Sequence, residues 1–197
     1  MSAFKYAIVI TGGIGTGKSS VSTILRLYGY TIIDADKIAH QVLEENSALV
    51  KELFSQDILD KDLKIDRKKL AQIIFSNEKD RRKLEHFLHP KIRQEILNQA
   101  SDLEIYKQYY FLDIPLFFEV GGRETYEVDK VLLIYAPREM QIQRIVTRDG
   151  ISEEEAIKRI DAQMDIEKKK LQSENIIKNT RGLKYLQEEV ENFLKTL

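Results

Sequence analysis

Residues 12–19 read Gly12-Gly13-Ile14-Gly15-Thr16-Gly17-Lys18-Ser19, and this octet decides how the chain is expected to fold. It matches the phosphate-binding pattern G-x-x-x-x-G-K-[ST] at every fixed position. The apolar run 7–10 before it suits a buried parallel strand. After it, Val21 and Leu25 recur at helical spacing until Gly29, where a helix would stop. A strand, a glycine-rich loop and a helix in this order predict a phosphate-binding loop, named here the phosphate loop (residues 12–19).

The residue types in the octet suit the capture of a triphosphate. Glycine tolerates a positive φ and lets successive backbone N–H groups curl around an anion, and the following helix points its positive end at the same anion. Lys18 would reach the β- and γ-phosphates, and the Ser19 hydroxyl would ligate Mg²⁺. The alternative is a glycine-rich turn with a chance lysine, which the flanking strand and helix disfavour.

Composition narrows the classes of function. Among 197 residues, 31 basic and 32 acidic side chains nearly cancel, so no global basic field favours nucleic acid. The absence of cysteine excludes disulfides, thiol catalysis and zinc–thiolate sites. No apolar run approaches membrane-spanning length, and residues 1–5 lack the form of a signal peptide. A soluble cytoplasmic protein without a nucleic-acid or membrane partner is therefore expected, with a monomer as the favoured state.

Strand-like runs alternate with longer helical patterns, which is typical of a parallel α/β sheet. The predicted strands are residues 6–11, 31–34, 109–113, 130–135 and 175–178. A capping box at Ser152 and Glu155 predicts a helix through Met164 toward Lys170, and a last helix from about Leu183 is expected to pack on the sheet.

The long stretch between the second and third predicted strands contains no convincing strand and indicates a helical insertion, a suitable place for a second substrate. Asp66 could cap one of its helices, with an inner face of Leu70, Ile73, Ile74 and Phe75. Pro90 is expected to interrupt a later helix.

Two carboxylates follow predicted strands, where ligands gather in an open parallel sheet. Asp36, just after the second strand, could accept a proton from an attacking hydroxyl or hold Mg²⁺-bound water, although it could also cap a helix; Asp34 suits the cap better. Asp113 ends the aromatic run 109–112 in the form of a Walker B strand, whose carboxylate supports the metal.

Arginine and histidine supply the remaining candidates. Arg144 and Arg148 share one face of a predicted helix and could offset charge on a transferred phosphoryl group from a closing lid, or they could pair with surface acids. His40 and His89 do not resemble a metal-binding histidine pair, and a lone histidine is more often a satisfied structural residue than a ligand.

Together these motifs resemble the dephospho-CoA kinase family from end to end. The matching segments are 11–19, Ile33-Asp34-Ala35-Asp36 with His40, His89-Pro90 with Ile92, 113–119, Arg144 with Arg148-Asp149-Gly150, and Glu155-Ala156 with Arg159-Ile160 and Gln163. The resemblance implies transfer of the γ-phosphate of ATP, with Mg²⁺, to the 3′-hydroxyl of the dephospho-CoA ribose, which is the last step of coenzyme A synthesis.

The resemblance also implies an architecture, the P-loop NTPase fold: a five-stranded parallel sheet flanked by helices, with a helical substrate-binding insertion and a lid. A single kinase domain over 1–197 would have its core at about 1–42, 107–143 and 172–197, a CoA-binding insertion at about 43–106, and a lid at about 144–171.

The resemblance further implies residue roles. Asp36 is the base, and Lys18 and Arg148 are also catalytic. The implied nucleotide contacts are Gly13, Ile14, Gly15, Thr16, Gly17, Lys18, Ser19, Ser20, Arg144 and Asn179. The implied acceptor contacts are Asp36, His40, His89, Pro115 and Leu116, and the implied Mg²⁺ ligands are Ser19 and Asp113.

One segment departs from the family pattern, and two other functions are possible alternatives to that of the family. The family tends to have Asn-x-Gly after the last strand, whereas the glycine here is displaced to Gly182, three residues after Asn179. A nucleoside monophosphate kinase would share the loop, lid and arginines, but the long insertion after Asp36 does not suggest its small nucleotide pocket. A nucleotide-gated binding protein would use ATP or GTP to control a partner. Specificity for GTP usually needs an Asn-Lys-x-Asp motif, which the sequence lacks.

Overall fold

The computed structural model of the protein describes residues 3–54, 58–62 and 64–197. The chain divides into two compact units. One unit comprises Met1–Ile33 with Ala100–Leu197, and the other comprises Asp34–Gln99. The first unit contains the phosphate loop, and the second begins just before the candidate base Asp36.

A parallel sheet is the framework of the first unit. Within the described residues it has five strands in the order β2-β3-β1-β4-β5, and β1 pairs in parallel with β3 and β4, and β4 with β5. The strands are β1 (Phe4–Gly12), β2 (Ile32–Asp34), β3 (Tyr110–Asp113), β4 (Val128–Tyr135) and β5 (Asn175–Lys178). The five predicted strands are therefore confirmed, with small shifts at their ends.

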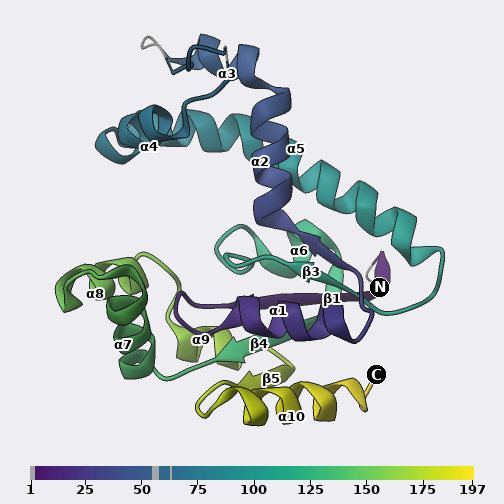
Figure 1. Ribbon diagram of the computed structural model, residues 1–197. Helices are drawn as coiled ribbons and strands as arrows, with labels where there is room; N and C mark the ends of the chain where they lie inside the picture. The colour runs from purple at the N-terminus through teal and green to yellow at the C-terminus, as the bar shows by residue number, and fades with distance from the viewer. Residues whose placement is uncertain (1–2, 55–57, 63) are drawn as a thin grey trace. The chain divides into compact units, whose positions relative to one another are not determined.

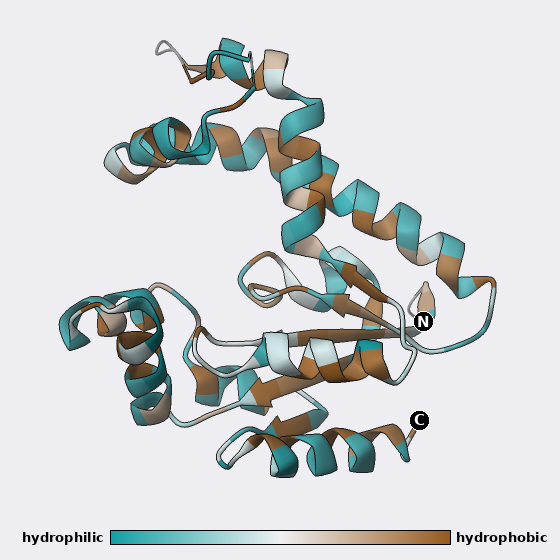
Figure 2. Cartoon of the chain, in the orientation of Figure 1, coloured by the Kyte–Doolittle hydropathy of each residue, from teal (hydrophilic) through white to brown (hydrophobic). Residues whose placement is uncertain are grey.

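Two helices cover one face of this sheet, α1 (Lys18–Leu27) and α10 (Leu183–Leu194) (Figure 1). Val21 and Leu25 of α1, with Leu186 and Val190 of α10, pack with apolar strand residues in one buried cluster. Figure 2 shows hydrophobic residues along the strands and on the side of α10 that faces them. The amphipathic pattern that predicted the last helix thus places it on the sheet, as expected.

The ends of α1 follow from two glycines. Gly17, at φ 88°, lies immediately before the first helical residue, and Gly29, at φ 86°, lies two residues after the last. The amide of Gly29 donates to the carbonyl of Arg26, and that of Tyr30 to the carbonyl of Leu25, so the left-handed glycine closes the helix as predicted.

The other helices of the first unit include α6 (Gly122–Tyr126), α7 (Arg138–Asp149), α8 (Glu153–Asp161) and α9 (Ile166–Leu171). α7 and α8 lie side by side around the buried residues Ile145, Ala156 and Ile160 (Figure 1). Ser152 caps α8 by accepting from the amide of Glu155 at 3.2 Å. The predicted run of one helix toward Lys170 is wrong, because α8 ends at Asp161 and Asp165 caps a separate helix.

The second unit is helical. It contains α2 (Ala35–Glu45), α3 (Ser47–Leu53), α4 (Arg67–Ser76) and most of α5 (Glu78–Glu104). Asp66 caps α4 by accepting from the amides of Lys68 and Lys69, as predicted.

Two predictions for this unit are wrong. Pro90 lies inside α5 without ending it; the carbonyl that loses its helical partner belongs to His86, which is exposed, so water can satisfy it. Phe75 is 88% exposed and does not share the inner face of α4. Each residue turns a helix by about 100°, so Phe75 lies on the far side from the buried Ile73.

Candidate active site

The phosphate loop joins the end of β1 to the start of α1 and needs glycine at two tight positions. Gly15 and Gly17 have φ of 79° and 88°, in the left-handed region that disfavours other residues. A Cβ on Gly15 would lie 2.8 Å from the carbonyl oxygen of Gln141, and one on Gly17 would overlap the amide nitrogen of Asn179. The loop therefore packs closely on the elements behind it.

Carbonyl groups of the loop are held by side-chain donors. The pairs are Lys169 Nζ with Gly12 O at 3.3 Å, Thr16 Oγ1 with Gly13 O at 2.8 Å, Arg144 Nη1 with Gly15 O at 3.2 Å, and Asn179 Nδ2 with Thr16 O at 2.8 Å. These bonds hold four main-chain acceptors of the loop in place.

Several amides of the loop, unlike these carbonyls, have no partner in the described part of the protein. Within the described part of the chain, the amides of Gly15 and Gly17 donate to no protein acceptor, and those of Lys18 and Ser19 open the first turn of α1. Such amides, at the positive end of a helix, bind phosphate oxygens. The geometry fits the anion site that the octet predicts.

Lys18 and Asp113 lie together beside this loop. The ammonium of Lys18 forms an ion pair with Asp113 Oδ1, and Asp113 Oδ2 accepts from the hydroxyl of Ser22 at 2.7 Å. Asp113 is 5% exposed, so these two donors stabilise a buried carboxylate. Sequence reasoning missed Ser22, although it follows Lys18 by four residues on α1 and so shares its face.

Arg144 reaches the loop, but as a donor to main-chain carbonyls. Besides Gly15 O, its guanidinium donates to the carbonyl oxygen of Asn179 at 2.9 Å, and burial lowers the pKa of the arginine. Arg144 therefore links α7 to the loop and to the end of β5. It has no ion pair with a surface acid among the described residues, so the alternative interpretation does not describe it.

Arg148 takes the other arrangement. Its guanidinium is exposed and bonds the carboxylate of Asp149 at 2.6 Å, and this hydrogen bond raises the pKa of the arginine and lowers that of the acid. Arg159 also donates to Asp149, at 2.9 Å. The pairing with a surface acid that was weighed for Arg148 is thus present in the structure.

Asn179 is buried behind the loop. Its side-chain amide holds Thr16 O, and its main-chain amide donates to the carbonyl of Tyr135 at 2.8 Å. The side chain that resemblance assigns to the nucleotide therefore also supports the loop from behind.

Four further side chains near the loop were not predicted to act there. Gln163 Oε1 accepts from the amide of Ile14 at 2.8 Å, and the buried Gln141 donates to the carbonyl of Ala136 at 2.8 Å. The other two, Lys169 and Glu119, form an ion pair at 2.9 Å. Of the four, Gln163 and Glu119 stood in quoted motifs, so the sequence offered a signal for those two residues but none for Gln141 or Lys169.

The predicted acceptor residues fall in both units. In the second unit, Asp34 caps α2 by accepting from the amide of Lys37 at 3.1 Å, whereas Asp36 lies exposed in the first turn of that helix. His40 on α2 and His89 on α5 are exposed too.

In the first unit, the segment after β3 carries the other two predicted acceptor residues. The carbonyl of Pro115 accepts from Thr11 Oγ1 at 3.0 Å, and Leu116 is 40% exposed. The exposed Leu116 is available to contact a ligand, while Pro115 is fixed through its main chain.

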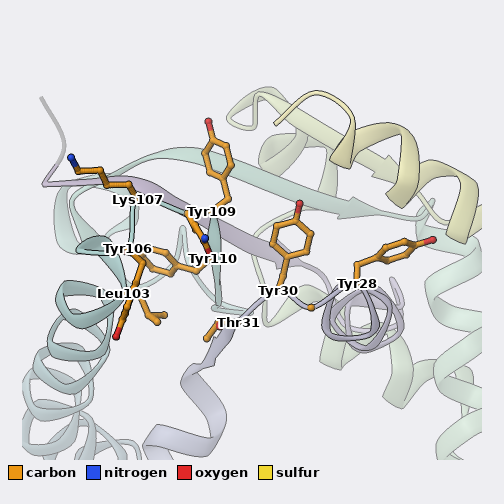
Figure 3. Close-up of a pocket in the computed structure, with 10 residues that line it drawn as sticks. Tyr28, Tyr30, Thr31, Leu103, Tyr106, Lys107, Tyr109 and Tyr110 are labelled. Atoms are coloured by element: carbon orange, nitrogen blue, oxygen red, sulfur yellow. The ribbon is translucent and has the colours of Figure 1, made fainter.

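A cavity of about 550 Å³ lies at the connections from α1 to β2 and from α5 to β3 (Figure 3). Tyrosines line it, but several of their hydroxyls are already bonded: Tyr28 to Glu191, Tyr109 to Lys130, and Tyr110 to the carbonyl of Ala100. These connections lead into β2 and β3 and so lie at the strands' amino ends, away from the phosphate loop. The cavity is not part of the candidate site.

The candidate metal ligands are two oxygen groups, those of Ser19 and Asp113. The part of the chain that is described has no group of three or more His, Cys, Asp or Glu residues able to hold a metal ion. The exposed Ser19 hydroxyl and the Asp113 carboxylate are hard oxygen donors of the kind that Mg²⁺ takes alongside substrate phosphates.

The described residues form no helix with the length and apolarity needed to span a membrane.

Comparison with known proteins gives a consistent result. A model of the dephospho-CoA kinase family matches residues 6–184. The dephospho-CoA kinase of Helicobacter pylori (strain J99) is 53% identical over 193 residues, covering 98% of each chain.

Solved structures agree on the fold. The dephospho-CoA kinase from Campylobacter jejuni has 38% identity, a TM-score of 0.72 and 98% coverage of both chains. Shikimate kinase from Acinetobacter baumannii, at 15% identity, has a TM-score of 0.52 and covers 96% of this chain and 91% of its own, which shows a shared fold alone. The predicted P-loop kinase fold is confirmed.

Proposed function

The chain belongs to the dephospho-CoA kinase family of ATP-dependent kinases, and we propose that it transfers the γ-phosphoryl group of ATP to the ribose 3′-hydroxyl of dephospho-CoA. The products would be coenzyme A and ADP, so the reaction is the last step of coenzyme A biosynthesis. The observation that carries this proposal is the match to the family over 98% of the chain. It is supported by a phosphate loop whose carbonyls are bonded, while the amides of Gly15 and Gly17 donate to no acceptor in the described part of the protein.

The nucleotide would bind through the phosphate loop. The amides of Gly15, Gly17, Lys18 and Ser19 would hold phosphate oxygens. Lys18 would exchange its contact with Asp113 for the β- and γ-phosphates. Arg144 and Asn179 would contribute from behind the loop, since each already bonds one of its carbonyls.

Mg²⁺ is the metal that these residues fit. Ser19 and Asp113 would hold it, and when bound it neutralises charge on the phosphate oxygens. Asp113 lies beside Lys18 at the end of β3, which supports this assignment. Within the chain itself, Ser22 keeps the Asp113 carboxylate oriented.

The acceptor would meet a base and a set of exposed side chains. We assign proton acceptance to Asp36, because an exposed carboxylate in the first turn of α2 suits a hydroxyl substrate. His40, His89, Pro115 and Leu116 are proposed to line the path of dephospho-CoA. Arg148 is proposed to offset charge on the moving phosphoryl group after leaving Asp149.

The acceptor-binding surface and the lid are proposed to lie in different parts of the chain. The helical unit Asp34–Gln99 is proposed to hold much of the CoA-binding surface, and residues 144–171 to act as the lid. A monomer in the cytoplasm is proposed as the working form, with ATP and dephospho-CoA as its small-molecule partners.

Replacement of the base tests the mechanism. Asp36→Asn is expected to lower kcat by about 10²- to 10⁴-fold, because general-base catalysis contributes on that scale. Asp34→Asn is the matched control two residues earlier: asparagine caps helices as well as aspartate, so its activity should stay near the wild-type value. A wild-type rate for Asp36→Asn would remove the base assignment.

The choice of acceptor tests the reaction itself. Coupled assays of ADP release should show rapid turnover with dephospho-CoA and little with AMP or CMP. Preference for AMP or CMP would identify a nucleoside monophosphate kinase instead, and slow hydrolysis independent of any acceptor would favour a nucleotide switch.

A further inference from the structure

Lys169, on α9, is a buried lysine that the proposed mechanism does not use. Its side chain is 0% exposed, and its ammonium lies 2.9 Å from Glu119 Oε1 and 3.3 Å from each of two main-chain carbonyl oxygens, those of Gly12 and Pro115. An ammonium removed from water is stable only when its hydrogens are bonded. Its three hydrogens here match three acceptors.

The two carbonyls belong to different parts of the proposed site. Gly12 begins the phosphate loop, and Pro115 lies two residues after the Walker B carboxylate Asp113. Thr11 Oγ1 also donates to Pro115 O, so β1 and the segment after β3 are joined at the same point. Lys169 therefore holds the loop and that segment at a fixed spacing.

The bond to Gly12 also bears on ligand capture. The carbonyl of Gly12 and the amide of Gly13 form one peptide group, and a cation on the carbonyl oxygen polarises the group and strengthens the amide as a donor. The charge of Lys169 thus acts on the loop through a main-chain dipole.

The ion-pair partner connects the end of α8 to the same point. Glu119 Oε1 also accepts from the amide of Met164 at 2.9 Å, and the preceding residue, Gln163, accepts from the amide of Ile14 in the loop. Residues 163–169 therefore contact the phosphate loop at both of their ends.

We propose that Lys169 is a positioning residue for phosphoryl transfer. Its ammonium fixes the Gly12 and Pro115 carbonyls, and it couples the phosphate loop to the segment after Asp113 and to the end of the lid. This rests on the proposed function, since the loop is assigned to ATP. The alternative is a buried ion pair with Glu119 that serves folding alone.

A pair of variants separates these two roles. Lys169→Met leaves Glu119 without its cation, and the double variant Lys169→Met/Glu119→Gln removes both charges. Replacing a buried pair by uncharged groups restores stability that the single change loses. In both variants the carbonyls of Gly12 and Pro115 lose the ammonium that holds them. If Lys169 positions the loop, the double variant should recover thermal stability, but its nucleotide binding and its kcat should stay impaired.

The measurements are calorimetric binding of a non-hydrolysable ATP analogue, kcat and KM for both substrates, and thermal denaturation. We expect the affinity for the analogue and kcat to fall by about ten- to a hundredfold in both methionine variants, the scale of a lost charge-assisted hydrogen bond. Lys169→Arg, which keeps the charge and donors, should recover part of the loss. Lys184→Met, at an exposed lysine of α10 outside the lid, should behave as wild type.

Wild-type analogue affinity and kcat in the double variant would overturn the proposal and leave Lys169 with a folding role. Binding of the analogue reports on the loop without any acceptor. If the wild-type protein failed to phosphorylate dephospho-CoA, the proposed function would fall while the comparison of analogue affinities would still decide the role of Lys169.

Discussion

A methyl group added at Gly17 tests the support behind the phosphate loop most directly. Gly17 has φ 88°, and a Cβ there would overlap Asn179 Nδ2, the atom that holds the carbonyl of Thr16. Gly17→Ala must therefore displace this buried amide. Gly29 offers a matched control, because it has φ 86° and a Cβ on it would meet no atom within 4 Å.

The structure allows the size of the effect to be worked out. Both alanine variants carry left-handed strain of about 1–2 kcal/mol. Alanine also lowers the conformational entropy of the unfolded chain, which offsets about 0.4–1 kcal/mol of this strain. Gly29→Ala should therefore lower the free energy of unfolding by about 0–1.6 kcal/mol. Gly17→Ala also breaks the bond from Asn179 to Thr16 and leaves buried groups unsatisfied, at a further cost of about 1–3 kcal/mol.

Urea unfolding measures the difference in the free energy of unfolding between the two variants. The strain at positive φ and the entropy of the unfolded chain affect both variants alike, so they cancel in this difference. We expect Gly17→Ala to be less stable than Gly29→Ala by about 1–3 kcal/mol. It should also bind the ATP analogue more weakly, because the peptide between Thr16 and Gly17 must turn, whereas Gly29→Ala should bind it normally. Equal losses of stability in the two variants, with unchanged affinity, would refute the reasoning.

Two further predictions concern other parts of the first unit. The carboxylate of Glu104 accepts hydrogen bonds from the amides of Lys5 and Tyr6, where the register of β1 shifts. Glu104→Ala should therefore lower the free energy of unfolding, measured in urea, by about 1–3 kcal/mol, and Glu104→Gln should stay nearer the wild-type value. A hydrogen bond from Arg148 lowers the pKa of Asp149 below its ordinary 3.8, so its stabilising contribution is present above that pH and is lost as the pH falls toward the folded pKa. Asp149→Asn should remove this part of the acid dependence of unfolding; an unchanged acid profile would argue against it.

Features set by a few neighbouring residues were predictable from the sequence. The caps at Asp34, Asp66 and Ser152 each depend on a side chain and an amide no more than three residues apart, and all three form. The phosphate loop and Asp113 were predictable for a similar reason, since the order of strand, loop and helix brings strand ends to one edge of the sheet.

Features decided by the rest of the fold were not predictable. Pro90 lost its usual effect because one side of α5 is exposed, and Phe75 was assigned to the wrong face from its apolar character alone. Lys169 stands in a run of three lysines that look alike. Ile166 is buried at the start of α9, and Lys169 follows it by three residues on the same face. The helix start at Ile166 was the missing signal.

The support of the loop also explains why the octet alone is weak evidence for a site. Apart from Thr16 within the loop, the side-chain donors to its carbonyls come from α7, from α9 and from the end of β5, and each follows the carbonyl that it holds by 129 to 163 positions. The same octet without these donors would turn its carbonyls to water, and its amides would lose their fixed direction. Arg144 is already bonded to two main-chain oxygens, so its charge also serves the loop. Lys18 and Arg148 are therefore the two cations, among the residues proposed to touch the phosphates, whose side chains are able to move onto a transferred phosphoryl group. To do so, Lys18 would leave the carboxylate of Asp113, and Arg148 would leave that of Asp149.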